Sequence, residues 1–171
     1  MIVVGASPLI ALGKMRRLEI LRELYGDVLI GPTVKEEVVD KGKIIGAQGV
    51  ELIEKALDEG WIQVVRLSAR ERKTAQRIMK ATRLDAGETE SLALAQSRKK
   101  MVIVDDREAR AMAAAMGLEL IGTAGVLLEG FLKGHLTMEQ LEDAVRELSR
   151  TIWLSPAVVA EILKRAREAR K

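Results

Sequence analysis

The stretch Met101–Arg110, MVIVDDREAR, gives the clearest indication of the fold class of this chain. Its four apolar, mostly β-branched residues predict a short strand that is buried on both faces of a sheet. Asp105 and Asp106 follow at once, so both carboxylates lie at the carboxyl end of that strand. Ligands bind at this edge of open α/β sheets. The pair therefore indicates a cation site, although either Asp alone can instead cap the helix that begins near Arg107.

Composition narrows the classes of function. The chain has 171 residues, 48% of them hydrophobic, which is enough for one core and predicts a single domain over residues 1–171. Aromatic residues make up 2%, which disfavours recognition of bases by stacking. The absence of cysteine and a lone histidine, His135, disfavour thiolate chemistry and zinc. The 28 basic and 25 acidic residues form a mixed surface that permits nucleic acid without requiring it.

The N-terminal segment MIVVGASPLIALGK, residues 1–14, is apolar over too few residues to span a membrane. It also has no basic region ahead of the apolar run, unlike a signal peptide. The sequence therefore predicts a cytoplasmic location and no membrane contact.

Strand and helix patterns alternate along the chain, and helices are added at its end. The expected strands are short runs of apolar residues that each finish at a turn or a helix cap. Residues 135–171 form a C-terminal helical extension, with capping patterns at Thr137 and Ser155. The alternation predicts an α/β fold, a three-layer α/β/α sandwich around a mostly parallel sheet. The predicted strands are 1–4, 28–30, 61–67, 101–104 and 119–121.

Glu37 lies on a helix predicted to begin at Thr33. At 100° per residue it falls beside Val34 and Val38, at the border of the buried stripe. A glutamate at such a border can point inward, toward the sheet edge, or extend its carboxylate to water. Both interpretations remain open from the sequence.

Glu88 is the carboxylate whose predicted position is energetically least favourable. It lies on the same helix face as Leu92 and Ala95, which should be packed, whereas Glu90 is predicted to project away. A buried charge costs free energy unless it is paired or bound to a metal ion. The competing interpretation is a first-turn glutamate that is stabilised by the helix dipole.

Two polar residues follow other strands. Ser7 is predicted to cap a helix with Pro8 at its first position, facing the sheet edge. The segment Gly122–Gly125 is a weak phosphate-loop pattern that fits close packing better, with Thr123 either capping a helix or lining the cleft. The closing KRAREARK, residues 164–171, is predicted to be a solvated helical end, with a phosphate-binding tail as the alternative.

The order of four short motifs resembles the PIN-domain family, in particular the small prokaryotic PIN-like group of the DUF3368 type, which is related to VapC-like toxin ribonucleases. Each motif is weak alone, but their order and spacing match over nearly the whole chain. The motifs are SPLI at residues 7–10, GE at 87–88, DDREAR at 105–110 and GTAG at 122–125.

This resemblance implies a Mg²⁺- or Mn²⁺-dependent endoribonuclease that acts on RNA, often as the toxin of a toxin–antitoxin pair with an antitoxin protein as partner, and a homodimer. It also implies the site. Metal ligands and catalytic residues would be the four carboxylates, and Ser7 and Thr123 would be polar residues of the cleft. Hard oxygen ligands suit Mg²⁺, which can lower the pKa of a water molecule and neutralise charge on a phosphodiester. The four carboxylates are Glu37, Glu88, Asp105 and Asp106.

One position departs from the family pattern. The aspartate that the family carries after its first strand is Gly5 here, so the site lacks one carboxylate. This departure favours an alternative function, a catalytically impaired PIN-like module that binds RNA or another protein. A receiver-like phosphoacceptor is disfavoured, because no suitably placed Lys follows a late strand.

Overall fold

The computed structural model describes residues 1–169, so the last two residues of the basic segment KRAREARK lie outside the described part. Its centre is a sheet of five strands in the order β3-β2-β1-β4-β5, and every neighbouring pair is parallel. The predicted α/β sandwich with a parallel sheet is therefore confirmed. The strands are β1 (Ile2–Val4), β2 (Val28–Ile30), β3 (Ile62–Val64), β4 (Val102–Ile103) and β5 (Leu120–Ile121).

The sheet is buried on both faces, as the apolar runs predict. In β1, Ile2 and Val4 pack into one hydrophobic layer and Val3 into the other. Successive strand residues point to opposite faces, so a continuous apolar run is needed where helices cover both sides. Ile2 lies opposite Val28 and Val3 opposite Val102.

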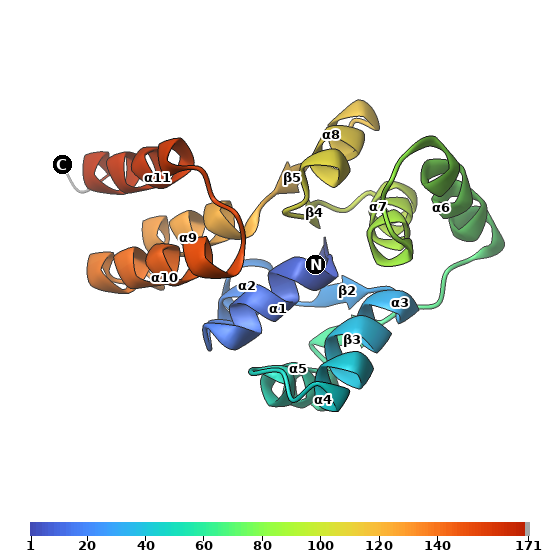
Figure 1. Cartoon of the computed structure of the whole chain (residues 1–171), viewed down its shortest axis with the longest axis horizontal. Coiled ribbons are helices and arrows are strands. Elements are labelled where there is room, and N and C mark those ends of the chain that lie inside the picture. Colours follow the sequence, from blue (N-terminus) through green and yellow to red (C-terminus); the bar gives the residue numbers. More distant parts are fainter. Residues whose placement is uncertain (170–171) are drawn as a thin grey trace.

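Two groups of helices cover the two faces of the sheet (Figure 1). The layer that contains Val3 is closed by α6 (Ala69–Ala81), α7 (Ala86–Arg98) and α8 (Arg107–Ala115). The layer that contains Ile2 is closed by α1 (Ala6–Lys14), α2 (Glu19–Tyr25), α5 (Val50–Asp58) and α9 (Thr123–Leu132). Between β2 and α5 the chain forms α3 (Pro32–Lys35), the π-helix η1 (Glu36–Lys41) and α4 (Gly42–Ile44).

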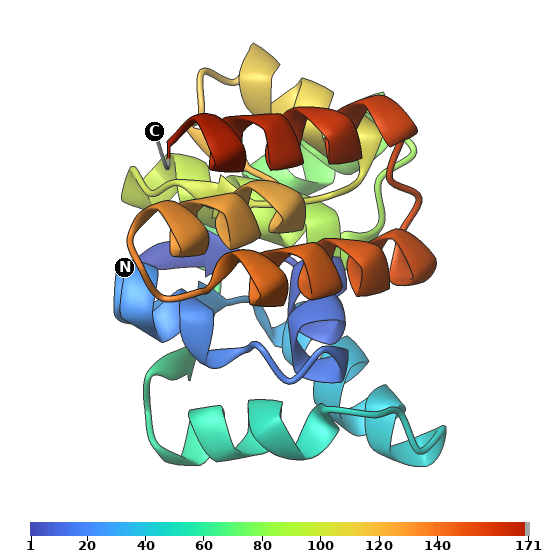
Figure 2. The ribbon, with the colours of Figure 1, turned by 90° about the vertical axis from the view of Figure 1, so that its left-hand side faces the viewer.

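The C-terminal helices α10 (Met138–Thr151) and α11 (Pro156–Glu168) pack beside α9 (Figure 2). They add Leu141, Leu148 and Ile162 to the same hydrophobic layer as α1 and α9. Both predicted caps are confirmed, because Thr137 and Ser155 each accept a hydrogen bond from a backbone N–H of the first turn. In residues 1–169, none of the helices combines the length and apolar character that crossing a membrane requires.

Two expectations about side chains are wrong. Ser7 does not cap α1, because the cap is Gly5 with extended backbone and Ser7 already lies inside the helix. Glu90 does not project away from the protein. It accepts hydrogen bonds from the backbone N–H of Thr33 (3.1 Å) and from its hydroxyl (2.6 Å). Helix α7 packs against both the sheet and α3, so the side of α7 opposite its apolar stripe does not face solvent freely.

Candidate functional site

A small pocket lies at the carboxyl ends of β1 and β4. From β1 the sheet extends to β2 on one side and to β4 on the other, so loops leave the sheet in opposite directions and a crevice opens between them. The pocket has a volume of about 90 Å³, enough for a few water molecules. Its polar lining residues are Ser7, Glu37, Asp85, Glu88, Asp105 and Asp106.

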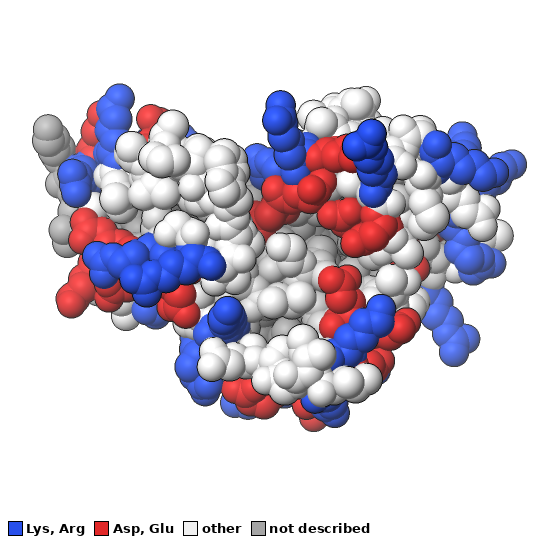
Figure 3. Space-filling model, viewed as in Figure 1, with Lys and Arg blue, Asp and Glu red and all other residues white. Residues whose placement is uncertain are grey.

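All four carboxylates proposed from the sequence therefore line one pocket, although they come from three separate parts of the chain. Glu37 lies on η1, Glu88 on the first turn of α7, and Asp105 and Asp106 between β4 and α8. Figure 3 shows acidic side chains bordering a hollow near the middle of this face, between α3 and α8. Lys and Arg are absent from the described residues that line the pocket.

Asp105 is fixed from behind by Thr123. The backbone N–H of Thr123 donates to Oδ1 of Asp105 (2.8 Å), and its hydroxyl donates to Oδ2 (2.6 Å). Thr123 is fully buried and does not line the pocket, so its place is behind the carboxylate and not in the cleft. Nor does it cap α9, whose cap is Gly122. Each oxygen of Asp105 keeps a further lone pair for a ligand.

Asp106 is the residue that caps α8. Its Oδ1 accepts a hydrogen bond from the backbone N–H of Ala109 (2.8 Å). The two interpretations of the Asp pair thus apply to different residues: Asp106 caps the helix, and Asp105 does not. Capping uses one oxygen of Asp106 and leaves the other available at the pocket wall.

Glu88 belongs to a capping box with Asp85. The backbone N–H of Glu88 donates to Asp85 Oδ1 (2.8 Å), and the backbone N–H of Asp85 donates to Glu88 Oε2 (3.1 Å). The first-turn interpretation of Glu88 therefore describes its backbone contacts, while the same side chain faces the pocket. Asp85 was not identified from the sequence as a pocket residue. The spacing of Asp85 and Glu88 is that of a capping box, which predicts the start of α7 but not that Asp85 lines the pocket.

Two carboxylates of the pocket, Glu37 and Glu88, have raised pKa values. Burial raises the pKa of Glu88 above its ordinary value, and this outweighs the backbone hydrogen bond from Asp85, which lowers it; the charges of Asp85, Asp106 and Glu37 raise it further. The pKa of Glu37 is also raised, first by burial and then by Asp85. Shifts in this direction show negative charge gathered in a place where water screens it poorly. Such a place favours binding of a cation.

The donor atoms fit Mg²⁺ or Mn²⁺ in kind, since both ions prefer carboxylate oxygens. The arrangement is less complete. Within residues 1–169, no three side chains of His, Cys, Asp or Glu come close enough together to hold a metal ion. The pocket thus has metal ligands of the right chemistry, but they form an open ligand set, in which fewer than three of the described side chains lie close enough together to bind one ion.

Gly5 is the position at which another carboxylate could enter this set. Its backbone is extended, with φ −77° and ψ 173°, a conformation that any residue adopts. An added Cβ would lie 3.5 Å from the carbonyl oxygen of Ile103 and 3.5 Å from Cγ1 of Val104, which are ordinary contacts. Neither the backbone nor crowding requires glycine here.

Comparison with known proteins agrees with the fold. The DUF3368 family model, described as a PIN domain, matches residues 1–168 and so includes every strand and helix named above. A search of curated proteins returns no match. PIN domains have a nuclease-type fold and generally depend on divalent metal ions. The chain belongs to the DUF3368 family of PIN domains.

Proposed function

We propose that this chain is a metal-dependent endoribonuclease that hydrolyses RNA phosphodiesters with Mg²⁺ or Mn²⁺ held by Glu37, Glu88, Asp105 and Asp106. The observation that supports it is the meeting of these carboxylates around one pocket at the crevice between β1 and β4. Carboxylates gathered around one pocket raise the free energy of the folded state, and a bound cation would offset that cost.

The surroundings of Asp105, Glu37 and Glu88 determine how these carboxylates would hold the ion. A bound divalent ion lowers the pKa of a coordinated water molecule and neutralises charge on the phosphodiester. Asp105 is held in place by Thr123, which limits the freedom it would lose on binding. Glu37 and Glu88 bind a cation when ionised, so their raised pKa values make a proton the competitor of the metal. Metal affinity should therefore increase with pH.

Cleavage of a single-stranded RNA in the presence of Mn²⁺ tests the proposal, with EDTA as the metal-free control. Glu37→Gln should lower the rate at least about 100-fold, the scale on which loss of a charge-stabilising group acts. The matched control is Glu36→Gln, which removes the neighbouring exposed carboxylate on η1 and should leave the rate unchanged. Cleavage that persists in EDTA, or that Glu37→Gln does not slow, would contradict the metal site.

The second candidate function is a PIN-like module that binds RNA or another protein without cutting. Gly5 favours it, because the open ligand set lacks a carboxylate at that position. The same experiment separates the two functions. The module predicts neither cleavage nor stabilisation by Mn²⁺, whereas the enzyme predicts both.

The partners that the family resemblance implies, and the cytoplasmic location predicted from the N-terminal segment, belong to this proposal too. A toxin would arrest growth when expressed alone and would be neutralised by an antitoxin protein encoded with it. A cytoplasmic homodimer would show twice the mass of the chain in sedimentation. Growth that is unaffected by expression would remove the toxin role and leave the nuclease proposal standing.

A further inference from the structure

A larger groove opens from the acidic pocket. It has a volume of about 1120 Å³ and shares Ser7, Glu88, Asp105 and Asp106 with the pocket. One wall is formed by α8 and β5, and the opposite wall by residues 152–155 and α11, with α9 between them. Anything long that lies in this groove reaches the carboxylates at one of its ends.

Trp153 stands on the wall of the groove formed by the turn between α10 and α11. Its side chain is 89% exposed, whereas the other tryptophan, Trp61, is only 4% exposed. Folding gains almost nothing from an indole in water, so stability does not explain Trp153. Although the composition disfavours stacking in general, an exposed indole beside a groove is a surface on which an unpaired base can stack.

Arginines line both walls. Arg107 and Arg110 lie on α8, and Arg165 lies on α11. Within residues 1–169, neither Arg107 nor Arg165 forms an ion pair, and both are exposed. Arg110 donates to the carbonyl oxygen of Val104 (3.1 Å) and keeps other N–H groups available. The described lining of the whole groove holds these three arginines and four carboxylates, but three of the carboxylates are those of the acidic pocket. Outside the pocket the arginines face only Glu161 among the described lining residues.

We infer that this groove binds single-stranded RNA: Arg107, Arg110 and Arg165 bind its phosphates, and a base stacks on Trp153. The inference rests on the proposed function, for which it supplies the route by which substrate reaches the pocket. An unpaired strand is required, because a base within a duplex cannot stack on a side chain. Arg165 binds a phosphate on the α11 wall, whereas Arg107 and Arg110 lie next to Asp105 and Asp106 and offset part of the negative charge that would repel a phosphodiester.

Binding of a fluorescent oligoribonucleotide of about ten nucleotides to the full chain in EDTA tests the stacking contact without cleavage. Trp153→Leu should weaken binding roughly 5- to 100-fold, the loss expected for one stacked base. Trp153→Phe keeps an aromatic face and should restore much of the affinity. Both variants should melt like the natural protein, because the side chain is exposed. Equal binding by all three proteins would overturn the inference.

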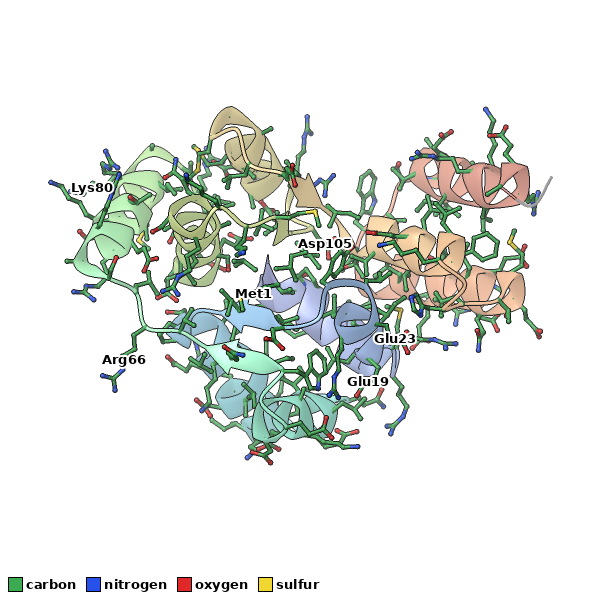
Figure 4. All side chains as sticks on the ribbon, turned by 180° about the vertical axis from the view of Figure 1, so that it is seen from behind. Met1, Glu19, Glu23, Arg66, Lys80 and Asp105 are labelled. Atoms are coloured by element: carbon green, nitrogen blue, oxygen red, sulfur yellow. The ribbon has the colours of Figure 1, made fainter. Side chains whose placement is uncertain are left out.

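The salt dependence of binding tests the phosphate contacts. For single strands, each phosphate contact contributes about 0.7 to the slope of log K against log salt concentration. Arg165→Gln should reduce that slope by about this amount, and Trp153→Leu should leave it unchanged. The matched control is Arg66→Gln, which removes an exposed arginine on the side of the molecule away from α9, α10 and α11 (Figure 4). An equal effect of Arg66→Gln would mean nonspecific attraction and would contradict the groove.

The outcomes separate this inference from the nuclease proposal. If the natural protein cleaves RNA with Mn²⁺ while Trp153→Leu and Arg165→Gln bind normally, the groove is not the route and the enzyme remains. If binding follows the predicted pattern but no variant or natural protein cuts, the groove is supported and the nuclease proposal fails. If sedimentation shows a dimer that Trp153→Leu converts to monomers, a second copy covers the groove and the inference is overturned.

Discussion

Gly5 is the residue on which metal binding should depend most. Gly5→Asp adds a carboxylate at the end of β1, in a backbone conformation and a space that both accept a side chain. We expect it to strengthen Mn²⁺ binding at least tenfold, because it completes the open ligand set beside Asp105. Mn²⁺ titration followed by calorimetry measures this directly. The melting temperature at a fixed Mn²⁺ concentration should rise as well, since a ligand that binds only the folded state stabilises it.

Gly5→Ala is the matched control, because it adds the same Cβ without the charge. Its Mn²⁺ affinity should equal that of the natural protein. If Gly5→Asp binds Mn²⁺ no better than Gly5→Ala, the missing carboxylate does not limit the site. RNA cleavage by the natural protein that Gly5→Asp fails to improve would lead to the same conclusion, and the four existing carboxylates would then suffice.

Glu88 should make stability fall as pH rises. Its folded-state pKa lies above the ordinary value of 4.5, so the folded protein holds this proton to a higher pH than the unfolded chain does. The penalty is absent below pH 4.5 and is complete above the raised pKa. Glu88→Gln removes the charge but keeps an oxygen for the capping box. Without metal we therefore expect its melting temperature to exceed that of the natural protein by about 1–3 °C at pH 7.

The difference between the two proteins should disappear near pH 4, where Glu88 is protonated in the natural protein. In Mn²⁺ the order should reverse, because Glu88→Gln loses a ligand and gains less stabilisation. A melting temperature that Glu88→Gln lowers equally at both pH values would mean that the side chain is only structural. Differential scanning fluorimetry over pH 4–8 in EDTA and in Mn²⁺ provides all of these comparisons.

The contact between the end of β4 and the start of α9 is the element-level support of the site. Thr123→Val keeps the shape of the side chain and the backbone hydrogen bond to Asp105. It removes the hydroxyl that donates a hydrogen bond to Oδ2 of Asp105. We expect a loss of about 2 kcal/mol in the free energy of unfolding, as for a buried hydrogen bond to a charged group. Urea denaturation measures it. Thr123→Ser keeps the hydroxyl and should lose clearly less; equal losses would point to packing and not to the hydrogen bond.

Strands and caps were predictable because their signals are local. The apolar run before Asp105 predicts β4, and the spacing of Thr137 and Gln140 predicts the cap of α10, which the structure confirms. Asp85 and Glu88 have the same spacing, which predicts the start of α7 but does not show that Asp85 also faces the pocket. Local signals thus predict where strands and helices begin, but not which capping residues also line the pocket.

Contacts between elements were not predictable in the same way. Glu90 binds Thr33 across 57 positions of sequence, and no periodicity within α7 can show that α3 lies beside it. The π-helix that carries Glu37 is equally invisible, because apolar periodicity predicts only an ordinary helix there. The place of the Asp pair was nevertheless foreseeable, since the carboxyl ends of parallel strands meet at one edge of the sheet. Glu37 and Glu88 lie on helices, and the resemblance to the PIN family indicated that they belong to the same site.

For the molecule as a whole, the C-terminal helices share a hydrophobic layer with the sheet. Leu148 in α10 and Ile162 in α11 are buried in the same layer as Ile2 in β1. The groove beside Trp153 depends on this packing, because α11 forms one of its walls. We therefore propose that residues 1–171 unfold as one domain, with residues 135–171 as an extension of the same core and not a separate unit.

Leu148→Ala tests this unity. Leu148 is fully buried, so removing its side chain should cost about 2–5 kcal/mol of unfolding free energy. If the chain is one cooperative unit, calorimetry should show a single transition, and Leu148→Ala should move it to lower temperature. Circular dichroism of the helices and the fluorescence of buried Trp61, which directly precedes β3, should show the same shift. Leu132→Ala, which shortens an exposed side chain of α9, is the control and should shift the transition temperature little. Two transitions, of which Leu148→Ala moves only one, would show that the extension folds on its own. The groove would then be formed between two units whose relative position RNA binding has to fix.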